Sequence, residues 1–177
     1  MKKKIVEIWS RIGKYGRFSI VQFPIFLILL FFVQKWQTRN LLANGSPVPS
    51  VALPMLSGDN FQVSNLSGKS VVIYLFAPWC KVCKISSVNV NRLYDSAEPA
   101  DVAVLAIALD YGNIEEVSKF KEDHKLRMPV LLGNAKTARD FKISGFPTFY
   151  FVNGEGRVIT KTIGFTTKTG LLLRQHL

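Results

Sequence analysis

Residues 71–83 read VVIYLFAPWCKVC, a hydrophobic run that ends in a tryptophan and a Cys-x-x-Cys pair. Every position of Val71–Phe76 is hydrophobic, which predicts a central strand covered on both faces of its sheet. Cys80 and Cys83 follow at once and are the only cysteines of the chain. The stretch therefore predicts a buried strand that leads into a helix beginning at Cys80, with both sulfurs in its first turn.

This placement favours redox chemistry. A helix N-terminus carries partial positive charge, which favours thiolate over thiol at Cys80 and makes it the predicted nucleophile. Cys83 lies one helical turn further along, where it can attack a mixed disulfide at Cys80 and release the partner. We assign the tuning of the thiol pKa to the neighbours Lys81, Val82 and Lys84. Positive charge from the lysines lowers a thiol pKa and makes the disulfide more oxidising.

Other uses of the pair have less support. A zinc site needs two more ligands, and the candidates His124 and His176 lie outside any recognisable ligand spacing, so we predict no metal and no cofactor. A purely structural bridge over so short a loop would stabilise the fold poorly. Thiolates do suit Cu(I), so a Cu(I)-binding or delivery module remains the alternative function. A third hypothesis is a structural membrane protein in which the cysteine pair has no catalytic role.

The N-terminal region indicates a membrane anchor. Phe18–Val33 is sixteen residues without a charge, slightly short of the roughly 17–25 that span a bilayer. Lys35 and Trp36 can extend the segment at the interface, so we predict a transmembrane helix over residues 18–36. Six basic residues precede it and two follow, which places the N-terminus in the cytoplasm.

The rest of the chain is then exported, and the predicted location is the bacterial inner membrane with a single pass and a periplasmic catalytic domain. A cleaved signal peptide is the rival interpretation, although Ala43 and Gly45 lie far beyond the apolar run. Residues 1–39 hold eight of the 23 Lys and Arg but one of the 12 Asp and Glu, so they carry +7 of the net charge of +11. Because the basic charge is mostly a topology signal, we predict no nucleic-acid partner.

The predicted domains are a basic cytoplasmic segment (1–17), the membrane helix (18–36), a linker (37–50) and a folded domain (51–177). The linker and the residues after it are rich in Gly, Pro and Ser, which indicates a tether that becomes ordered near Val51. Within the folded domain we expect a short hairpin around 56–63, strands at 102–109, 128–132, 148–152 and 158–163, and helices at 80–96, 113–124, 135–141 and 167–177. Strands joined through helices, followed by a hairpin, predict a mixed-sheet α/β domain.

Two motifs together resemble the thioredoxin fold: Ala77–Lys84, reading APWCKVCK, and Ser144–Phe149, reading SGFPTF. The resemblance covers about residues 48–177. The hairpin expected ahead of the main strand is similar to the membrane-anchored TlpA/ResA/DsbE-like group, and within it to protein disulfide oxidoreductases of the ScsD type, which are linked to copper tolerance. It implies a thioredoxin-like fold with an N-terminal hairpin extension and the transmembrane helix.

The resemblance also implies a binding surface. Pro147 is expected to be cis and to face the cysteines, Phe146 to offer its backbone to a substrate strand, and Trp79 to shield the disulfide. Two positions that carry acids in relatives hold Tyr74 and Ser86 here. No buried carboxylate is therefore evident beside the pair, although Asp110 could approach from a distance.

The sequence thus predicts a membrane-anchored periplasmic thiol:disulfide oxidoreductase. Its partners would be exported thiol or disulfide proteins, in copper tolerance or in cytochrome c maturation. The resemblance adds a membrane electron donor of the DsbD type as a partner. The direction of electron flow stays open at this point, since anchored relatives include reductants and the exported compartment is oxidising.

Overall fold

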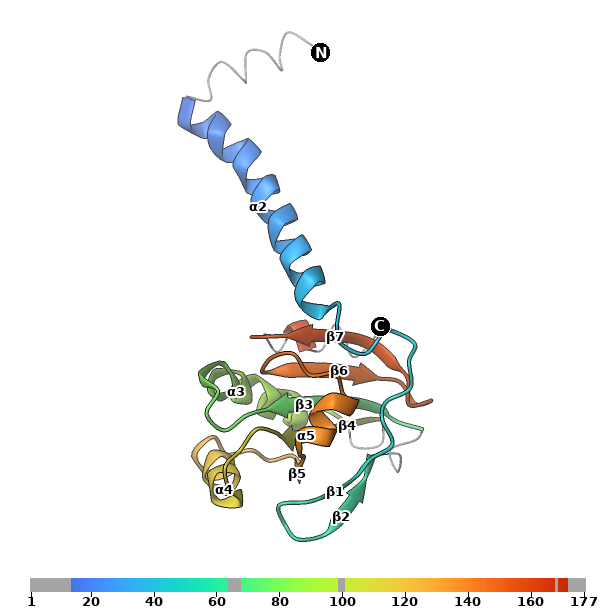
Figure 1. Ribbon diagram of the computed structural model, residues 1–177. Helices are drawn as coiled ribbons and strands as arrows, with labels where there is room; N and C mark the ends of the chain where they lie inside the picture. The colour runs from blue at the N-terminus through green and yellow to red at the C-terminus, as the bar shows by residue number, and fades with distance from the viewer. Residues whose placement is uncertain (1–13, 64–67, 99–100, 168, 172–177) are drawn as a thin grey trace. The chain divides into compact units, whose positions relative to one another are not determined.

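The computed structural model describes residues 14–63, 68–98, 101–167 and 169–171. The chain divides into two units, one reaching to Arg39 and one beginning at Asn40. The described elements (Figure 1) are α2 (Lys14–Thr38), β1 (Ala52–Pro54), β2 (Asn60–Gln62), β3 (Ser70–Phe76), α3 (Lys81–Ser96), β4 (Val102–Ala108), α4 (Ile114–Asp123), β5 (Val130–Leu132), α5 (Ala135–Asp140), β6 (Thr148–Val152) and β7 (Val158–Ile163).

A five-stranded mixed sheet organises the second unit, with strand order β5-β4-β3-β6-β7. Strands β3, β4 and β5 are parallel, whereas β6 pairs antiparallel with both β3 and β7. The hydrophobic run of the sequence forms β3 at the centre of this sheet, and its last six residues are all buried. The prediction of a strand covered on both faces is confirmed.

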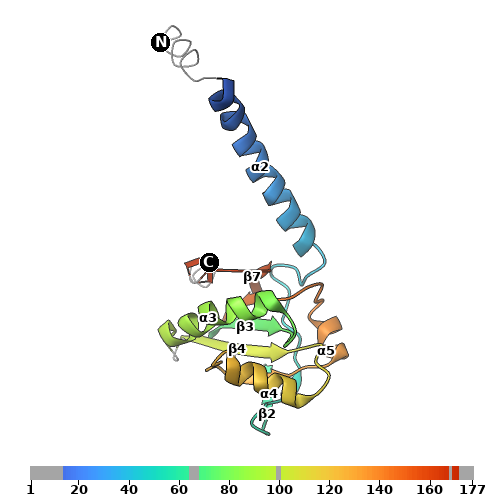
Figure 2. The same ribbon diagram turned by 90° about the vertical axis from the view of Figure 1, so that its left-hand side faces the viewer.

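Each face of the sheet carries its own hydrophobic core. Alternate β3 residues such as Tyr74 and Phe76 join α3 and α4 in one core, and Ile73 and Leu75 join the other core with Phe141. Figure 2 looks onto the face that α3 and α4 cover, whereas α5 lies at the edge of that view. Successive side chains of β3 point to opposite faces because a strand has a two-residue period. Cys80 and Cys83 belong to the first core, so they pack on the face of β3 that carries Tyr74 and Phe76.

Residues 41–50 differ from the tether that the sequence analysis predicts. Leu41 and Leu42 are buried in the second core. Gly45 N donates to Val158 O at 2.7 Å and Val48 N to Gly156 O at 2.9 Å, so this segment lies along the β6–β7 hairpin. Its Gly and Pro content is typical of a linker, but Leu41, Leu42 and Val48 pack against the second core and cover a sheet face that would otherwise be exposed. The ordered domain therefore begins near residue 40 and not near Val51.

The other elements agree with the sequence within a few residues. The antiparallel pair β1–β2 forms the expected N-terminal hairpin extension, and Asn153 organises the turn between β6 and β7 by accepting bonds from Glu155 N and Arg157 N. Residues 169–171 are helical and Leu171 is buried. Of the helix predicted over 167–177, Thr167 is not helical, and residues 168 and 172–177 lie outside the described residues.

In the first unit, α2 covers the residues for which we predict a membrane anchor. Its side chains from residue 22 to residue 33 are all exposed. Pro24 lies inside the helix, as a membrane helix tolerates. Among the described residues, no helix combines the length and apolarity needed to cross a membrane. The anchor over 18–36 stays a prediction.

Tyr150 on β6 provides a test of the packing under residues 41–50. Its hydroxyl donates to Phe141 O at 2.6 Å and accepts from Leu42 N at 3.2 Å. Burial raises the pKa of Tyr150 to about 12 from 10.0, and the Leu42 N–H bond opposes part of that rise. Because the folded pKa is the higher one, the neutral hydroxyl stabilises the fold below pH 10, and this contribution is lost as the pH rises from 10 to 12.

We therefore expect Tyr150→Phe to lower the free energy of unfolding by about 1–3 kcal/mol at pH 8, because two buried backbone groups lose their partner. The difference from the parent protein should shrink between pH 10 and pH 12. Urea unfolding at both ends of that interval measures it, with Tyr94→Phe, at an exposed position, as the control. A difference that does not change with pH would contradict the assignment.

Candidate active site at the start of helix α3

Cys80 and Cys83 form a disulfide at the start of α3, with their Cα atoms 5.2 Å apart. Cys80 is the N-cap residue of the helix, and its sulfur accepts a hydrogen bond from Cys83 N at 3.1 Å. Cys80 keeps 5% of its surface exposed and Cys83 none. Cys80 is therefore the sulfur that a partner can reach, and a helix amide already points at it. This geometry agrees with the predicted order of attack at Cys80 and resolution by Cys83.

Trp79 lies beside the pair and is held from two sides. Its Nε1–H donates to Asp110 O at 2.9 Å and to Asp110 Oδ2 at 3.2 Å. Its ring meets the Phe146 ring edge to face, with centroids 5.9 Å apart. Asp110 follows β4 with a φ of 51°, a left-handed conformation that aspartate tolerates. The indole stays 60% exposed, so Trp79 presents an aromatic surface next to the disulfide and is not a core residue.

Phe146 and Pro147 lie where the resemblance implies. The Phe146–Pro147 peptide bond is cis. Pro147 is buried and its carbonyl accepts from Gly164 N at 2.8 Å, whereas Phe146 is half-buried against the core that holds both cysteines. Within the described part of the chain, no hydrogen bond uses the amide or the carbonyl of Phe146. An extended partner segment could pair with these groups, and substrate binding at Trp79, Phe146 and Pro147 stays a prediction.

Tyr74 lies behind the pair, at one of the two positions for which the resemblance implied an acid. Tyr74 is fully buried on β3, its ring is stacked between Phe76 and Phe149, and its hydroxyl donates to Cys83 O at 3.0 Å. Burial raises the Tyr74 pKa far above its usual value, so the hydroxyl stays protonated. The sequence indicated only a core residue. Its contact with the resolving cysteine depends on the register of β3 under α3, which no local pattern reveals.

None of the described Asp and Glu side chains is buried, which agrees with the expectation that no buried carboxylate lies beside the pair. Asp110 is exposed and is bonded to Trp79, the residue before Cys80. Within the described chain, no group of three or more His, Cys, Asp or Glu residues is placed to hold a metal ion.

The predicted tuning residues are exposed in the first turns of α3. Val82 is 39% exposed, and Lys81 and Lys84 are exposed as well. Lys84 acts electrostatically on His124, whose pKa is lowered first by burial and then by this lysine. The positive charge of Lys84 therefore acts on the C-terminal end of α4. The influence of the three residues on the thiols stays a prediction.

A cleft of about 910 Å³ opens beside the disulfide. Trp79 and Phe146 line it, and its polar side chains include those of Asp110, Tyr111, Asn134, Arg139 and Ser144. These polar residues follow the ends of β4 and β5, occupy α5 or follow it, so the cleft lies at the edge where the parallel strands end. Sequence reasoning missed it because its walls come from four separate segments of the chain.

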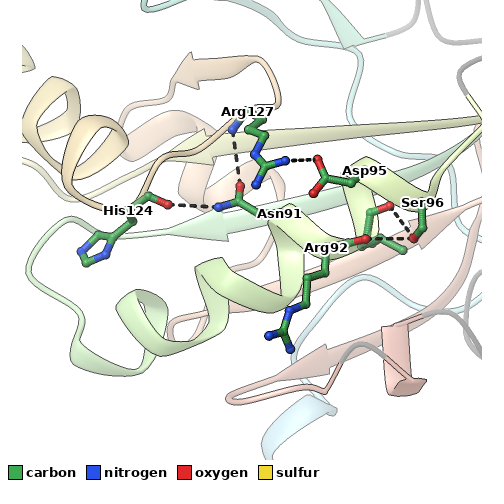
Figure 3. Close-up of polar contacts among 7 residues, drawn as sticks. Asn91, Arg92, Asp95, Ser96, His124 and Arg127 are labelled. Atoms are coloured by element: carbon green, nitrogen blue, oxygen red, sulfur yellow. Dashed lines mark hydrogen bonds and ion pairs between the residues drawn. The ribbon is translucent and has the colours of Figure 1, made fainter.

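A polar network fixes the other end of the catalytic helix (Figure 3). Asn91 Nδ2 donates to His124 O at 3.0 Å, and Asn91 Oδ1 accepts from Arg127 N at 3.4 Å. Arg127 also forms an ion pair with Asp95, with Nη1 and Oδ1 2.6 Å apart. Buried Asn91 thus ties α3 to the segment after α4, which holds the helix that carries both cysteines in place.

Trp79→Ala tests the aromatic surface. Interface tryptophans often contribute 2 kcal/mol or more, so we expect KM for a protein disulfide to rise by about tenfold or more. The free energy of unfolding should change by less than about 1 kcal/mol, because the ring is mostly exposed. Steady-state turnover of a protein disulfide measures the effect, and Tyr94→Ala, in the last turns of α3, is the matched control. An unchanged KM would remove Trp79 from the binding surface.

Comparisons with known proteins agree with this geometry. Residues 44–161, well over half of the chain, match the model of the AhpC/TSA family. The chain is 27% identical over 128 residues to the thiol-disulfide oxidoreductase ResA of Bacillus cereus, covering 72% of this chain and 73% of the relative. It is 26% identical over 132 residues to ResA of Bacillus subtilis, covering 74% and 73%.

Solved structures show the same fold. A putative thiol:disulfide interchange protein DsbE from Chlorobium tepidum superposes with a TM-score of 0.68 at 25% identity, covering 76% of this chain and 94% of that one. StoA from Bacillus subtilis superposes with a TM-score of 0.63 at 22% identity, covering 73% and 98%, and supports the fold alone. With a Cys-x-x-Cys disulfide at the start of α3, the chain belongs to the AhpC/TSA family and is a thiol–disulfide oxidoreductase of the thioredoxin fold.

Proposed function

We propose that this oxidoreductase exchanges disulfides with exported proteins while the helix at residues 18–36 anchors it in the bacterial inner membrane. The observation that carries the exchange reaction is the disulfide at the N-cap of α3, with Cys80 partly accessible and Cys83 buried behind it. A partner thiolate attacks the Cys80 sulfur, the bond to Cys83 breaks, and its electron pair leaves on the Cys83 sulfur. A second partner thiolate then displaces Cys80, which leaves the partner oxidised and this protein reduced.

The surroundings of Cys80 suit an extended polypeptide substrate. Phe146 offers an amide and a carbonyl that no described residue bonds, and Trp79, whose ring contacts Phe146, offers an exposed aromatic surface. Backbone pairing of this kind gives affinity with little dependence on side chains. This supports protein substrates of varied sequence over one small molecule.

The membrane part of the proposal rests on the sequence and on the character of α2. Phe18–Val33 lacks charge and follows six basic residues, and the large apolar side chains from Phe23 to Val33 are exposed. Exposed apolar side chains along a helix need a nonaqueous partner, and a bilayer provides one. A membrane electron donor of the DsbD type would then be available to keep the pair reduced. In that case the exchange runs in the other direction: the Cys80 thiolate attacks a disulfide of the partner, and Cys83 then releases the partner in its reduced form.

A topology experiment tests the anchor. Alkaline phosphatase or a green fluorescent protein is fused after Leu177 of the full chain and expressed in a Gram-negative host. We expect the phosphatase fusion to be active, the fluorescent fusion to be dark, and both to remain with the membrane after alkaline carbonate extraction. A fluorescent and extractable fusion would refute both the export and the anchor.

The cellular process is a separate part of the proposal, and copper tolerance and cytochrome c maturation are the two candidates that follow from the ScsD-type and DsbE-type resemblance. Deletion in the source bacterium, complemented with the parent gene or with a Cys80→Ser gene, separates them by copper sensitivity and by haem-stained c-type cytochromes. Titration of the reduced protein with Cu(I) addresses the alternative function. Tight stoichiometric binding without disulfide exchange would favour a copper module over an oxidoreductase acting on exported proteins.

A further inference from the structure

One buried polar atom near the disulfide has no partner. Ser86 is fully buried, and its Oγ is the one buried side-chain nitrogen or oxygen of the described residues that makes no hydrogen bond. An unsatisfied buried hydroxyl costs about 1–3 kcal/mol. A helical serine ordinarily avoids this cost by bonding a carbonyl of the preceding turn, as Ser87 does with Lys84 O at 2.7 Å.

Ser86 faces the same side of α3 as the resolving cysteine. Cys83, Ser86, Val90 and Leu93 are all fully buried, and their spacing of three and four residues describes one face of a helix. Residues three apart on a helix are neighbours, with Cβ atoms about 5–6 Å apart. Side chains of a helix also lean toward its N-terminus, which for Ser86 is the direction of Cys83.

The exchange reaction creates negative charge at this place. When a partner thiolate attacks Cys80, the electron pair of the broken bond leaves on Cys83, which has no exposed surface. No buried carboxylate or lysine lies among the described residues, and the Tyr74 hydroxyl is already bonded to Cys83 O. Cys83 N donates to the other sulfur. Among these groups, only the Ser86 hydroxyl has no acceptor and so remains able to donate to the Cys83 sulfur.

We propose that the Ser86 hydroxyl is a redox-linked hydrogen-bond donor, unpartnered in the disulfide form and bonded to the Cys83 sulfur once the disulfide opens. The serine keeps its proton throughout. In the reverse direction the Cys83 thiol releases its proton to the departing partner thiolate or to water, and attacks the Cys80 sulfur of the mixed disulfide. Ser86 is therefore a positioning residue that favours the dithiol form and stabilises Cys83 as a leaving group. This inference rests on the exchange chemistry and deepens it.

Ser86→Ala in the full chain tests the proposal by equilibration with reduced and oxidised glutathione. We expect the equilibrium to shift toward the disulfide by about tenfold, equivalent to a reduction potential about 30 mV lower. Reduction by glutathione should slow as well, because the leaving sulfur loses its donor. Ser87→Ala, on the same helix with a hydroxyl that is already bonded, should stay within about twofold of the parent protein.

Unfolding of both redox forms distinguishes this role from packing. Ser86→Ala should not destabilise the oxidised form but should destabilise the reduced form. Equal changes in both forms, with an unchanged glutathione equilibrium, would overturn the proposal. The pair Ser86→Thr and Ser86→Val differs in the hydroxyl alone and guards against a poorly folding alanine variant, since the threonine protein should be the less easily oxidised of the two. The assay contains no exported substrate or membrane, so its failure would leave the proposed function intact.

Discussion

Cys80→Ser is expected to reduce the catalysed rate of thiol–disulfide exchange by at least about 1,000-fold, because removal of an attacking nucleophile abolishes the covalent pathway. The expectation follows from the accessible position of Cys80 and from the helix amide that its sulfur accepts. Reduction of a protein disulfide by a dithiol, followed with and without the enzyme, measures the loss. The fold itself should survive, since a bridge between residues three apart removes little chain entropy.

Cys83→Ser should fail at the next step of the same reaction. The variant can still form a mixed disulfide at Cys80 but has no sulfur that releases the partner. We expect a covalent complex that accumulates on non-reducing gels and disappears on addition of dithiothreitol. The double variant Cys80→Ser/Cys83→Ser is the control and should trap nothing. Trapping by Cys80→Ser with turnover retained in Cys83→Ser would reverse the two assigned roles.

The sequence predicted the strands and helices around the pair because each carries a local signal. Hydrophobic continuity predicts β3 and β4. Asn113, a residue type that favours the start of a helix, caps α4 by accepting a bond from Glu116 N at 3.0 Å. The β6–β7 hairpin has Asn153 and Gly154 in its turn, which are typical turn residues. These signals depend on a few neighbouring residues, so no long-range contact was needed to interpret them.

Contacts across the sheet had no such signal. The bond from Tyr74 to Cys83 O joins a strand and a helix nine residues apart, and the bond from Trp79 to Asp110 joins two loops separated by 31 residues. Residues 41–50 are half Gly, Pro and Ser, a composition that predicts a tether. Their burial depends on an uncovered sheet face, and such a face exists only once the sheet has formed.

The reacting residues of the site can be predicted from the sequence, whereas the residues that orient them cannot. Residues that react, Cys80 and Cys83, are identified by their type and spacing. Residues that orient them are identified by position in the fold, because a tyrosine, an aspartate or a serine has many ordinary uses in a sequence. Ser86 shows the difference: in the sequence it is only a position without an acid, whereas its unsatisfied hydroxyl depends on the packing of α3 on β3.

Phe149→Ala is expected to lower the free energy of unfolding by about 3–5 kcal/mol, which is the usual cost of deleting a buried phenylalanine ring. Phe149 has no exposed surface and stacks on Tyr74 with centroids 5.1 Å apart. Small domains are stable by about 5–15 kcal/mol, so the variant should approach global instability at 37 °C. Chemical unfolding measures the loss, and Phe165→Ala, at a ring that is 53% exposed, should change stability by less than about 1 kcal/mol.

The same variant also tests whether the core beneath the pair positions it. The Phe149 ring supports the Tyr74 ring, and Tyr74 donates to the carbonyl of Cys83 in the first turn of α3. A cavity at residue 149 should loosen that turn, so exchange activity measured well below the unfolding temperature should fall several-fold, whereas Tyr150→Phe on the opposite sheet face should leave it unchanged. Full activity in a strongly destabilised Phe149→Ala protein would show that the geometry of the cysteine pair is held by α3 alone, with the aromatic stack contributing stability but no orientation.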